Sequence, residues 1–380
     1  MNRKHVFYYK FFRLLVIVFL KCTFGYRYTK AENLPENYLV ISNHVTDYDP
    51  ILVTCSFPRQ MYFVGSEHIS RWKLAYTFLK TCFAPIMRPK GASAASTVID
   101  IIRHVKKGAS VCLFAEGVRS WDGRSCPIDP STAKMVKKLG CGLVTYRIVG
   151  GYFASPMWGG ASIRRGYLHG GPVRVFTPDQ LNEMSVDEIY AAIMEDTRED
   201  AYARQLADPK PYRSKKPAEH LERLLFLCPR CGGRDTFSSS GDTVTCSGCE
   251  HTFRYTEYGM LEGTDFDTVQ AFSDWQNQQV AADVEAGTAY TAAFASLSVI
   301  DKHQETYLTE GPLSLSRDGL TCGDFSLPFE SISDLAMFGQ KNLVFTANKT
   351  YYQLTPAEGA NCLKFLLYYE ACKRTAEIVR

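Results

Sequence analysis

Four of the thirteen cysteines stand in two C-x-x-C pairs, a spacing that constrains the fold of the 380-residue chain more than any other feature of its sequence. The pairs are Cys228 with Cys231 and Cys246 with Cys249. Four thiolates complete the tetrahedral coordination that Zn²⁺ prefers, so we predict a structural zinc site with no open position for catalysis. The alternative is two redox dithiols, which occur more naturally at the start of a helix in a thioredoxin-like setting.

The segment around these cysteines resembles a zinc ribbon, which raises the question of a nucleic-acid partner. Its arginines, Arg230 and Arg234, are balanced by Asp235 and Asp242. The whole chain has 43 Lys and Arg against 40 Asp and Glu, a formal charge of +3. Neither the segment nor the chain offers the basic surface that nucleic acid requires. We predict no nucleic-acid partner and interpret the ribbon as a protein-contact or spacer module.

The other cysteines are scattered singly through apolar or mixed segments, as Cys112 is between Val111 and Leu113. An odd total without an even framework argues against a disulfide scaffold and for a reducing compartment. We expect these single cysteines to be small apolar core residues.

The first 30 residues carry seven basic side chains and no acidic one, namely Arg3, Lys4, Lys10, Arg13, Lys21, Arg27 and Lys30. The longest apolar run there is Leu14–Leu20, whereas a membrane-spanning helix needs about 20 apolar residues. On a helix, Lys10, Arg13 and Lys21 fall within an arc of about 80° and leave a wide apolar surface. We therefore expect residues 1–30 to form a helix in the membrane interface, with its cations facing anionic headgroups.

Three alternatives apply to this basic segment. A secretory signal peptide would need a small-residue cleavage site, and none follows Leu20. A lipoprotein signal is disfavoured because Lys21 stands immediately before Cys22. The third alternative is a helix packed on the protein's own core. With the unpaired cysteines, the interfacial interpretation predicts association with the cytoplasmic face of a membrane.

Strand and helix patterns alternate up to about residue 215, which predicts an α/β domain, a mixed sheet flanked by helices. The expected strands cover 38–42, 61–64, 111–114, 143–148 and 173–176. The expected helices cover 93–107 and 186–206, and a shorter one starts at Asp49-Pro50. After a proline-rich linker at 208–216, short strands at 313–316, 326–329, 342–346 and 350–355 precede a closing helix at 357–373.

This C-terminal pattern predicts a small β-rich domain of the pleckstrin-homology type, closed by a helix. Its acidic residues and few basic clusters do not support lipid binding there, so a protein partner is the expectation for the C-terminal half. The predicted organisation is an anchor helix, the α/β domain, a zinc ribbon, a helical connector and the β domain, over residues 1–30, 31–215, 216–262, 263–290 and 291–380.

The polar loop at residues 43–49 holds His44 and Asp49 with H-x4-D spacing at a strand-to-helix junction. There a carboxylate can hold an imidazole in one tautomer and aim it into a cleft. The structural explanation is that Asp49 caps the helix before Pro50 and that His44 is an ordinary loop histidine. The loop alone favours that explanation.

Two other segments favour a functional role for His44 and Asp49 over the structural explanation. A predicted buried strand runs into Ala115–Ser120, at a strand end where ligands of α/β sheets bind. Arg88 follows another apolar stretch, and Arg88 and Arg119 converging on one cleft would suit a phosphate. The alternative is that both arginines are solvated surface charges.

Taken in order, these segments resemble the glycerolipid acyltransferase family that includes 1-acylglycerol-3-phosphate acyltransferase. The family's NH-x4-D motif is matched at Asn43, His44 and Asp49, its arginine-bearing second motif at Pro85–Arg88, and its FPEGTRS motif by FAEGVRS at Phe114–Ser120. Ala115 and Val118 depart from the third motif, and the fourth, at 143–148, lacks the usual proline.

The resemblance implies that His44 is a general base, oriented by Asp49, for the free hydroxyl of a lysophospholipid. That oxygen would attack the thioester of acyl-coenzyme A or an acyl-carrier protein without a catalytic cofactor. Arg88 and Arg119 would hold the acceptor's phosphate, and Glu116 with the Gly117 backbone would shape that site. The alternative function is a membrane-bound scaffold with a degenerate acyltransferase domain that recruits partners through its C-terminal half.

Overall fold

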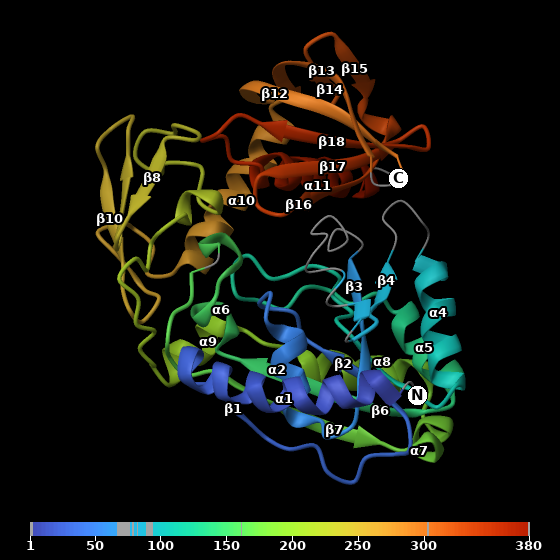
Figure 1. Ribbon diagram of the computed structural model, residues 1–380. Coiled ribbons are helices and arrows are strands. Elements are labelled where there is room, and N and C mark those ends of the chain that lie inside the picture. The colour runs from blue at the N-terminus through green and yellow to red at the C-terminus, as the bar shows by residue number, and fades with distance from the viewer. Residues whose placement is uncertain are drawn as a thin grey trace. The chain divides into compact units, whose positions relative to one another are not determined.

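The computed structural model describes residues 3–66, 77, 80, 81, 83–88, 94–160, 162–301 and 304–378. The chain divides into two compact units (Figure 1). The first comprises Met1–Met157 and Ala161–Ser214, and the second comprises Trp158–Gly160 and Lys215–Arg380.

A seven-stranded mixed sheet forms the centre of the first unit, in the order β1-β7-β6-β2-β5-β3-β4. The strands from β6 to β4 run parallel, β7 is antiparallel to β6, and β1 is parallel to β7. This arrangement confirms the predicted α/β class. The strands are β1 (Arg27–Tyr28), β2 (Tyr38–Ser42), β3 (Met61–Ser66), β4 (Ile86–Arg88), β5 (Ser110–Leu113), β6 (Gly142–Val149) and β7 (His169–Phe176).

Helices cover both faces of this sheet, which explains why its central strands are continuous apolar runs. Leu39 and Ile41 of β2 pack with residues of α4, α5 and α8 on one face. On the other face α2 packs on β6 and β7, and α1 packs on α2. The helices are α1 (Arg3–Phe24), α2 (Asp49–Ser56), α4 (Ala94–Lys106), α5 (Ser131–Leu139), α6 (Gly151–Ala154), α7 (Pro178–Glu183), α8 (Val186–Thr197) and α9 (Ala201–Ala207).

The helix predicted over 186–206 is two helices, α8 and α9. Asp200 begins the second one, because its side chain accepts a hydrogen bond from the N–H of Ala203. Two hydrogen bonds to another segment also stabilise the break between the helices. Glu199 N donates to Ser125 Oγ, and Ser125 N donates to the Glu199 carbonyl. The prediction of one continuous helix was therefore wrong, because Asp200 caps a second helix within the predicted range.

Helix α1 has one face on the protein and one face exposed. Tyr9, Leu20 and Phe24 are buried. Arg13 is turned toward α2 and donates to the carbonyls of Thr54 and Cys55, so the expectation that it faces headgroups was wrong. Among the described residues, no helix is long and apolar enough to cross a membrane.

The second unit begins with a four-stranded sheet in the order β11-β10-β9-β8, followed by α10 (Val269–Glu285). Its strands are β8 (Phe237–Ser240), β9 (Thr243–Cys246), β10 (Thr252–Tyr255) and β11 (Leu261–Glu262). Gln276 of α10 is hydrogen-bonded to the segment that precedes this sheet. Its Oε1 accepts from Phe226 N, and its Nε2 donates to the Leu224 carbonyl.

A seven-stranded antiparallel sheet completes the second unit, in the order β15-β14-β13-β12-β18-β17-β16. It confirms the predicted C-terminal β-rich domain. The elements are β12 (Tyr290–Asp301), β13 (Gln304–Leu315), β14 (Gly319–Cys322), β15 (Phe325–Pro328), β16 (Ile332–Phe338), β17 (Asn342–Ala347), β18 (Thr350–Pro356) and α11 (Leu363–Ile378). Helix α11 starts later than predicted, because Gly359 adopts φ +93° and Asn361 Oδ1 accepts from Lys364 N.

Most single cysteines that the structure describes are core residues, as predicted. The buried ones are Cys55, Cys112, Cys141, Cys322, Cys362 and Cys372. The prediction was wrong for Cys22, which is exposed on α1. Cys126 is half-buried, and Cys82 lies outside the described residues.

Candidate active site and metal centre

The loop after β2 is fixed to the end of β6 by Asn43. Its Nδ2 donates to the Ile148 carbonyl at 2.9 Å, and its Oδ1 accepts from Ile148 N at 2.8 Å. Both polar groups of the buried Asn43 side chain therefore have hydrogen-bond partners. They fix the direction in which the loop leaves the carboxyl end of β2.

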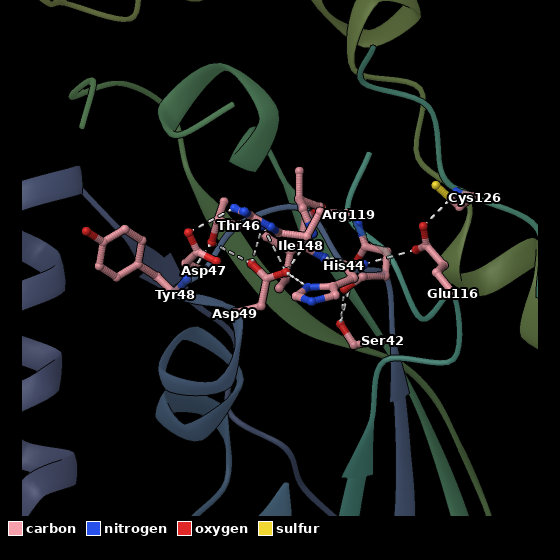
Figure 2. Close-up of polar contacts among 12 residues, drawn as sticks. Ser42, His44, Thr46, Asp47, Tyr48, Asp49, Glu116, Arg119, Cys126 and Ile148 are labelled. Atoms are coloured by element: carbon pink, nitrogen blue, oxygen red, sulfur yellow. Dashed lines mark hydrogen bonds and ion pairs between the residues drawn. The ribbon is translucent and has the colours of Figure 1, made fainter. Parts of the chain in front are cut away.

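The structure brings His44 and Asp49 together in this loop (Figure 2). His44 Nδ1 lies 2.7 Å from Asp49 Oδ2, and the side chain of Asp49 is fully buried, whereas that of His44 is 24% exposed. The same carboxylate accepts from Val45 N at 2.6 Å and from Thr46 Oγ1 at 2.6 Å. Because a carboxylate accepts, Nδ1 donates, and Nε2 keeps its lone pair. Among the described residues, none is hydrogen-bonded to Nε2.

Asp49 does not cap helix α2, contrary to the structural explanation of its position. The N-cap residue is Tyr48, which makes no side-chain capping bond, and Asp49 is the first helical residue, followed by Pro50. Its carboxylate turns back into the loop and accepts from Thr46 N at 3.0 Å. The side chain thus organises residues 43–49, called the histidine loop below.

Glu116, in the segment between β5 and α5, connects this loop with a later part of its own segment. Its Oε1 accepts from His44 N at 3.0 Å, and its Oε2 accepts from Cys126 N at 2.6 Å (Figure 2). Burial raises the pKa of the Glu116 carboxyl to about 7, against the opposing effect of these hydrogen bonds. Gly117 adopts φ +71° and closes a turn by donating to the Phe114 carbonyl. The Phe114 ring stacks on His44 with centroids 4.6 Å apart.

The two arginines predicted to bind phosphate differ in what the structure describes. Arg119 lies near the histidine loop, where its Nη1 is 3.1 Å from Asp47 Oδ2. Its side chain is 13% exposed, whereas that of Asp47 is 71% exposed. Arg88 ends β4, but its side chain lies outside the described residues.

A small pocket opens beside His44. Glu116 and Ser120 line it, together with Arg124 and Glu199, which were not among the predicted site residues. Arg124 stands close behind the FAEGVRS segment in sequence and could have been found there. No sequence signal marks Glu199, which lies at the break between α8 and α9 and binds Arg204 with both carboxylate oxygens.

The four paired cysteines form a candidate metal centre in the second unit. Their sulfur atoms all lie within 4.8 Å of one another. The sulfurs of Cys228 and Cys249 are 3.7 Å apart, and those of Cys231 and Cys246 are 3.8 Å apart. A tetrahedron of sulfurs around Zn²⁺, with Zn–S distances of about 2.3 Å, has edges of about 3.8 Å. The donor set and its spacing therefore fit a closed four-thiolate zinc site.

Comparison with known proteins finds a family match for part of the first unit. Residues 25–149 match the family model described as Acyltransferase. The crystal structure of the 1-acyl-sn-glycerophosphate (LPA) acyltransferase PlsC from Thermotoga maritima is similar at 19% identity and TM-score 0.42, covering 53% of this chain and 81% of that chain. At that TM-score the likeness establishes neither fold nor activity. No curated protein matches the chain. The segment that matches this family model holds His44, Asp49 and Glu116.

Proposed function

We propose that the chain transfers a fatty acyl group from acyl-coenzyme A or an acyl-carrier protein to the hydroxyl of a lysophospholipid. The observation that carries this proposal is the pair of His44 and Asp49, in which Nδ1 is held at 2.7 Å and the lone pair of Nε2 is left for chemistry. In an acyltransferase-family domain, such an imidazole is suited to act as a general base.

In the proposed reaction, His44 Nε2 takes the proton of the acceptor hydroxyl. The oxygen attacks the thioester carbonyl carbon, the new C–O ester bond forms, and the C–S bond breaks. The imidazolium returns the proton to the departing thiolate, so the histidine ends as it began. Asp49 stabilises the transient imidazolium and keeps the ring in one tautomer. No covalent acyl-enzyme and no catalytic cofactor are needed.

The acceptor is proposed to be 1-acylglycerol-3-phosphate, which would give phosphatidic acid. Arg119 supports this choice, because a guanidinium next to the histidine loop can bind a phosphate. Arg88, on β4 of the same sheet, is the second proposed phosphate ligand. Glu116 and Gly117 contribute by shaping the loops around the pocket.

The acceptor and product are lipids, and α1 offers a surface for contact with them. Its outward face exposes large apolar side chains, at Phe7, Phe11, Leu14, Leu15, Val18 and Phe19. Lys4, Lys10 and Lys21 are exposed on the same helix and complement anionic headgroups. We propose that the chain binds the cytoplasmic face of a membrane through α1.

The second unit is proposed to be a zinc-dependent interaction module. Cys228, Cys231, Cys246 and Cys249 would bind one structural Zn²⁺. The sheet from β12 to β18 and the closing helix α11 are interpreted as a pleckstrin-homology type of domain that binds a protein partner.

Product analysis by mass spectrometry tests the proposed reaction. The purified full chain is given acyl-coenzyme A or acyl-carrier protein and vesicles containing lysophospholipids that differ only in headgroup. Acylation with a preference for the phosphate headgroup is the expected result. Preference for a neutral headgroup would contradict the phosphate role of the arginines, and no acylation of any acceptor with either donor would contradict the proposed function.

A further inference from the structure

The two faces of α1 lie on opposite sides of the helix and have different surroundings. At about 100° per residue, Phe7, Phe11, Leu14 and Val18 fall within an arc of about 60°. They are 65%, 51%, 65% and 61% exposed. Tyr9, Arg13, Leu20 and Phe24 lie on the opposite side. The helix can therefore contact lipids with one face while the other contacts only protein.

The protein-facing side of α1 holds the C-terminal end of α2. Arg13 Nη2 donates to the Cys55 carbonyl at 2.6 Å, and Arg13 Nε donates to the Thr54 carbonyl at 3.2 Å. Tyr9 OH donates to the Phe57 carbonyl at 3.0 Å. The last carbonyls of a helix lack partners within it and carry partial negative charge, so a guanidinium is a suitable donor there.

The end of α1 also contacts the start of α2. The ring of Phe24 packs edge-on against that of Tyr48, with centroids 4.9 Å apart. Tyr48 immediately precedes Asp49, the first residue of an α2 that is eight residues long. Because α2 spans only about two turns, we expect a shift of one end to be transmitted to the other. Displacement of α1 would therefore move Asp49 relative to His44.

We infer that Arg13 is a positioning residue, which holds α2 so that Asp49 stays on His44 Nδ1 and so couples lipid contact by α1 to the catalytic pair. The inference rests on the proposed function. It gives Arg13 a role distinct from that of the exposed cations on the same helix. Lys21 is exposed, and among the described residues its ammonium makes no hydrogen bond to α2, so its main role would be in membrane binding.

Three variants separate these roles in the full chain. Arg13→Met removes both guanidinium bonds to α2, and Tyr9→Phe removes one hydroxyl while keeping the ring. Lys21→Met is the matched control, because it removes the same charge from the exposed side of α1. The probe is a vesicle of phosphatidylcholine and anionic phosphatidylglycerol. The measurements are vesicle binding, kcat and KM, and amide hydrogen exchange at Val45 and Thr46, whose N–H groups donate to Asp49.

We expect Arg13→Met to speed exchange at these two amides about tenfold and to lower kcat by a similar factor, with vesicle binding as in the wild type. Added vesicles should slow this exchange in the wild type but not in Arg13→Met. Lys21→Met should weaken vesicle binding about fivefold and leave exchange at Val45 and Thr46 as in the wild type. Tyr9→Phe should act as Arg13→Met does, but less strongly.

The amide hydrogen-exchange rates at Val45 and Thr46 test the positioning role of Arg13 independently of catalytic turnover. If Arg13→Met and Tyr9→Phe both exchange at Val45 and Thr46 like Lys21→Met, the positioning role is wrong, whatever the activity. If Arg13→Met does not fold, Tyr9→Phe gives the answer alone. If the wild type transfers no acyl group, the proposed function fails, and the exchange comparison still tests the contact between α1 and the Asp49 loop.

Discussion

One oxygen of Asp49 fixes both the side chain and the backbone of the histidine loop, because Oδ2 lies 2.7 Å from His44 Nδ1 and 2.6 Å from Val45 N. The imidazole is therefore oriented by a group that the loop itself holds in place. Asparagine at this position has one oxygen and one NH₂ group. It cannot accept from His44 and from all the backbone donors together.

We therefore predict that Asp49→Asn lowers kcat about 10³-fold or more, since the amide favours the tautomer with its proton on Nε2. Asp47→Asn is the control, because it removes one carboxylate from the same loop without touching His44. Steady-state kinetics of both variants gives the comparison. A kcat for Asp49→Asn within a few-fold of the control would show that Asp49 does not orient the base.

If Arg119 binds the acceptor phosphate as proposed, Asp47, whose Oδ2 lies 3.1 Å from Arg119 Nη1, competes with that phosphate. Because the Asp47 carboxylate is exposed, we expect the pair to contribute about 1 kcal/mol or less, so Asp47→Asn should lower KM for a phosphate-bearing acceptor about two- to fivefold. Arg119→Ala should raise the same KM. Acceptors without phosphate serve as the control. If Asp47→Asn raises KM as Arg119→Ala does, the pair acts by holding the loops together.

The raised pKa of Glu116 predicts that the free energy of unfolding depends on pH. Its folded-state pKa is raised to about 7, so folding favours the protonated form. The associated stabilisation is complete below pH of about 4.5 and is lost as pH rises to about 7, with a total of about 3 kcal/mol. Urea unfolding of the wild type and Glu116→Gln across pH 4.5–8 measures it. The difference in free energy of unfolding between them should fall over this range and then level off; parallel curves would contradict the burial effect.

Metal removal should destabilise the C-terminal sheet as well as the ribbon. Asp235, between Cys231 and β8, contacts Lys364 of α11, which is only 2% exposed and also donates to the Thr291 carbonyl at 2.7 Å. Cys249→Ser should abolish stoichiometric zinc and loosen this link. Asp235→Asn should keep the metal but cost about 3 kcal/mol, because a buried ammonium loses its carboxylate.

Elemental analysis and thermal unfolding of the two variants test this link, with Cys22→Ser as a cysteine control outside the metal centre. One zinc per chain is expected in Asp235→Asn and in the control. Zinc-free wild-type protein, purified without chelator, would contradict the metal assignment. Unchanged unfolding of the β-rich sheet in both variants would contradict the link through Lys364.

The buried strands were the part of the fold that sequence predicted best. The strand predicted at 38–42 coincides with β2, and those at 111–114 and 143–148 lie within one residue of β5 and β6 at each end. These strands are covered on both faces, so their apolar runs are continuous and end where the polar loops begin. In contrast, β13 is mostly exposed from Gln304 to Pro312, and only its last residues were predicted.

The contact between His44 and Asp49 was predicted from the sequence, but other contacts of the candidate site were not. His44, Asp49 and Glu116 were identified from motifs, but not the two backbone bonds that make Glu116 a connector between loops. Glu199 comes to the pocket from far along the chain, where a capping residue breaks a helical pattern. Contacts of this kind depend on tertiary packing, which local periodicity does not encode.

The most direct test of the account is acyl transfer to 1-acylglycerol-3-phosphate by the wild type, His44→Ala and His169→Ala. His169 lies at the start of β7, where it contacts Thr29, and is the control for loss of an imidazole from the same unit. The account predicts phosphatidic acid from the wild type and from His169→Ala, and a rate at least about 10²-fold lower from His44→Ala. Equal rates from all three proteins would contradict the assignment of His44 as the base.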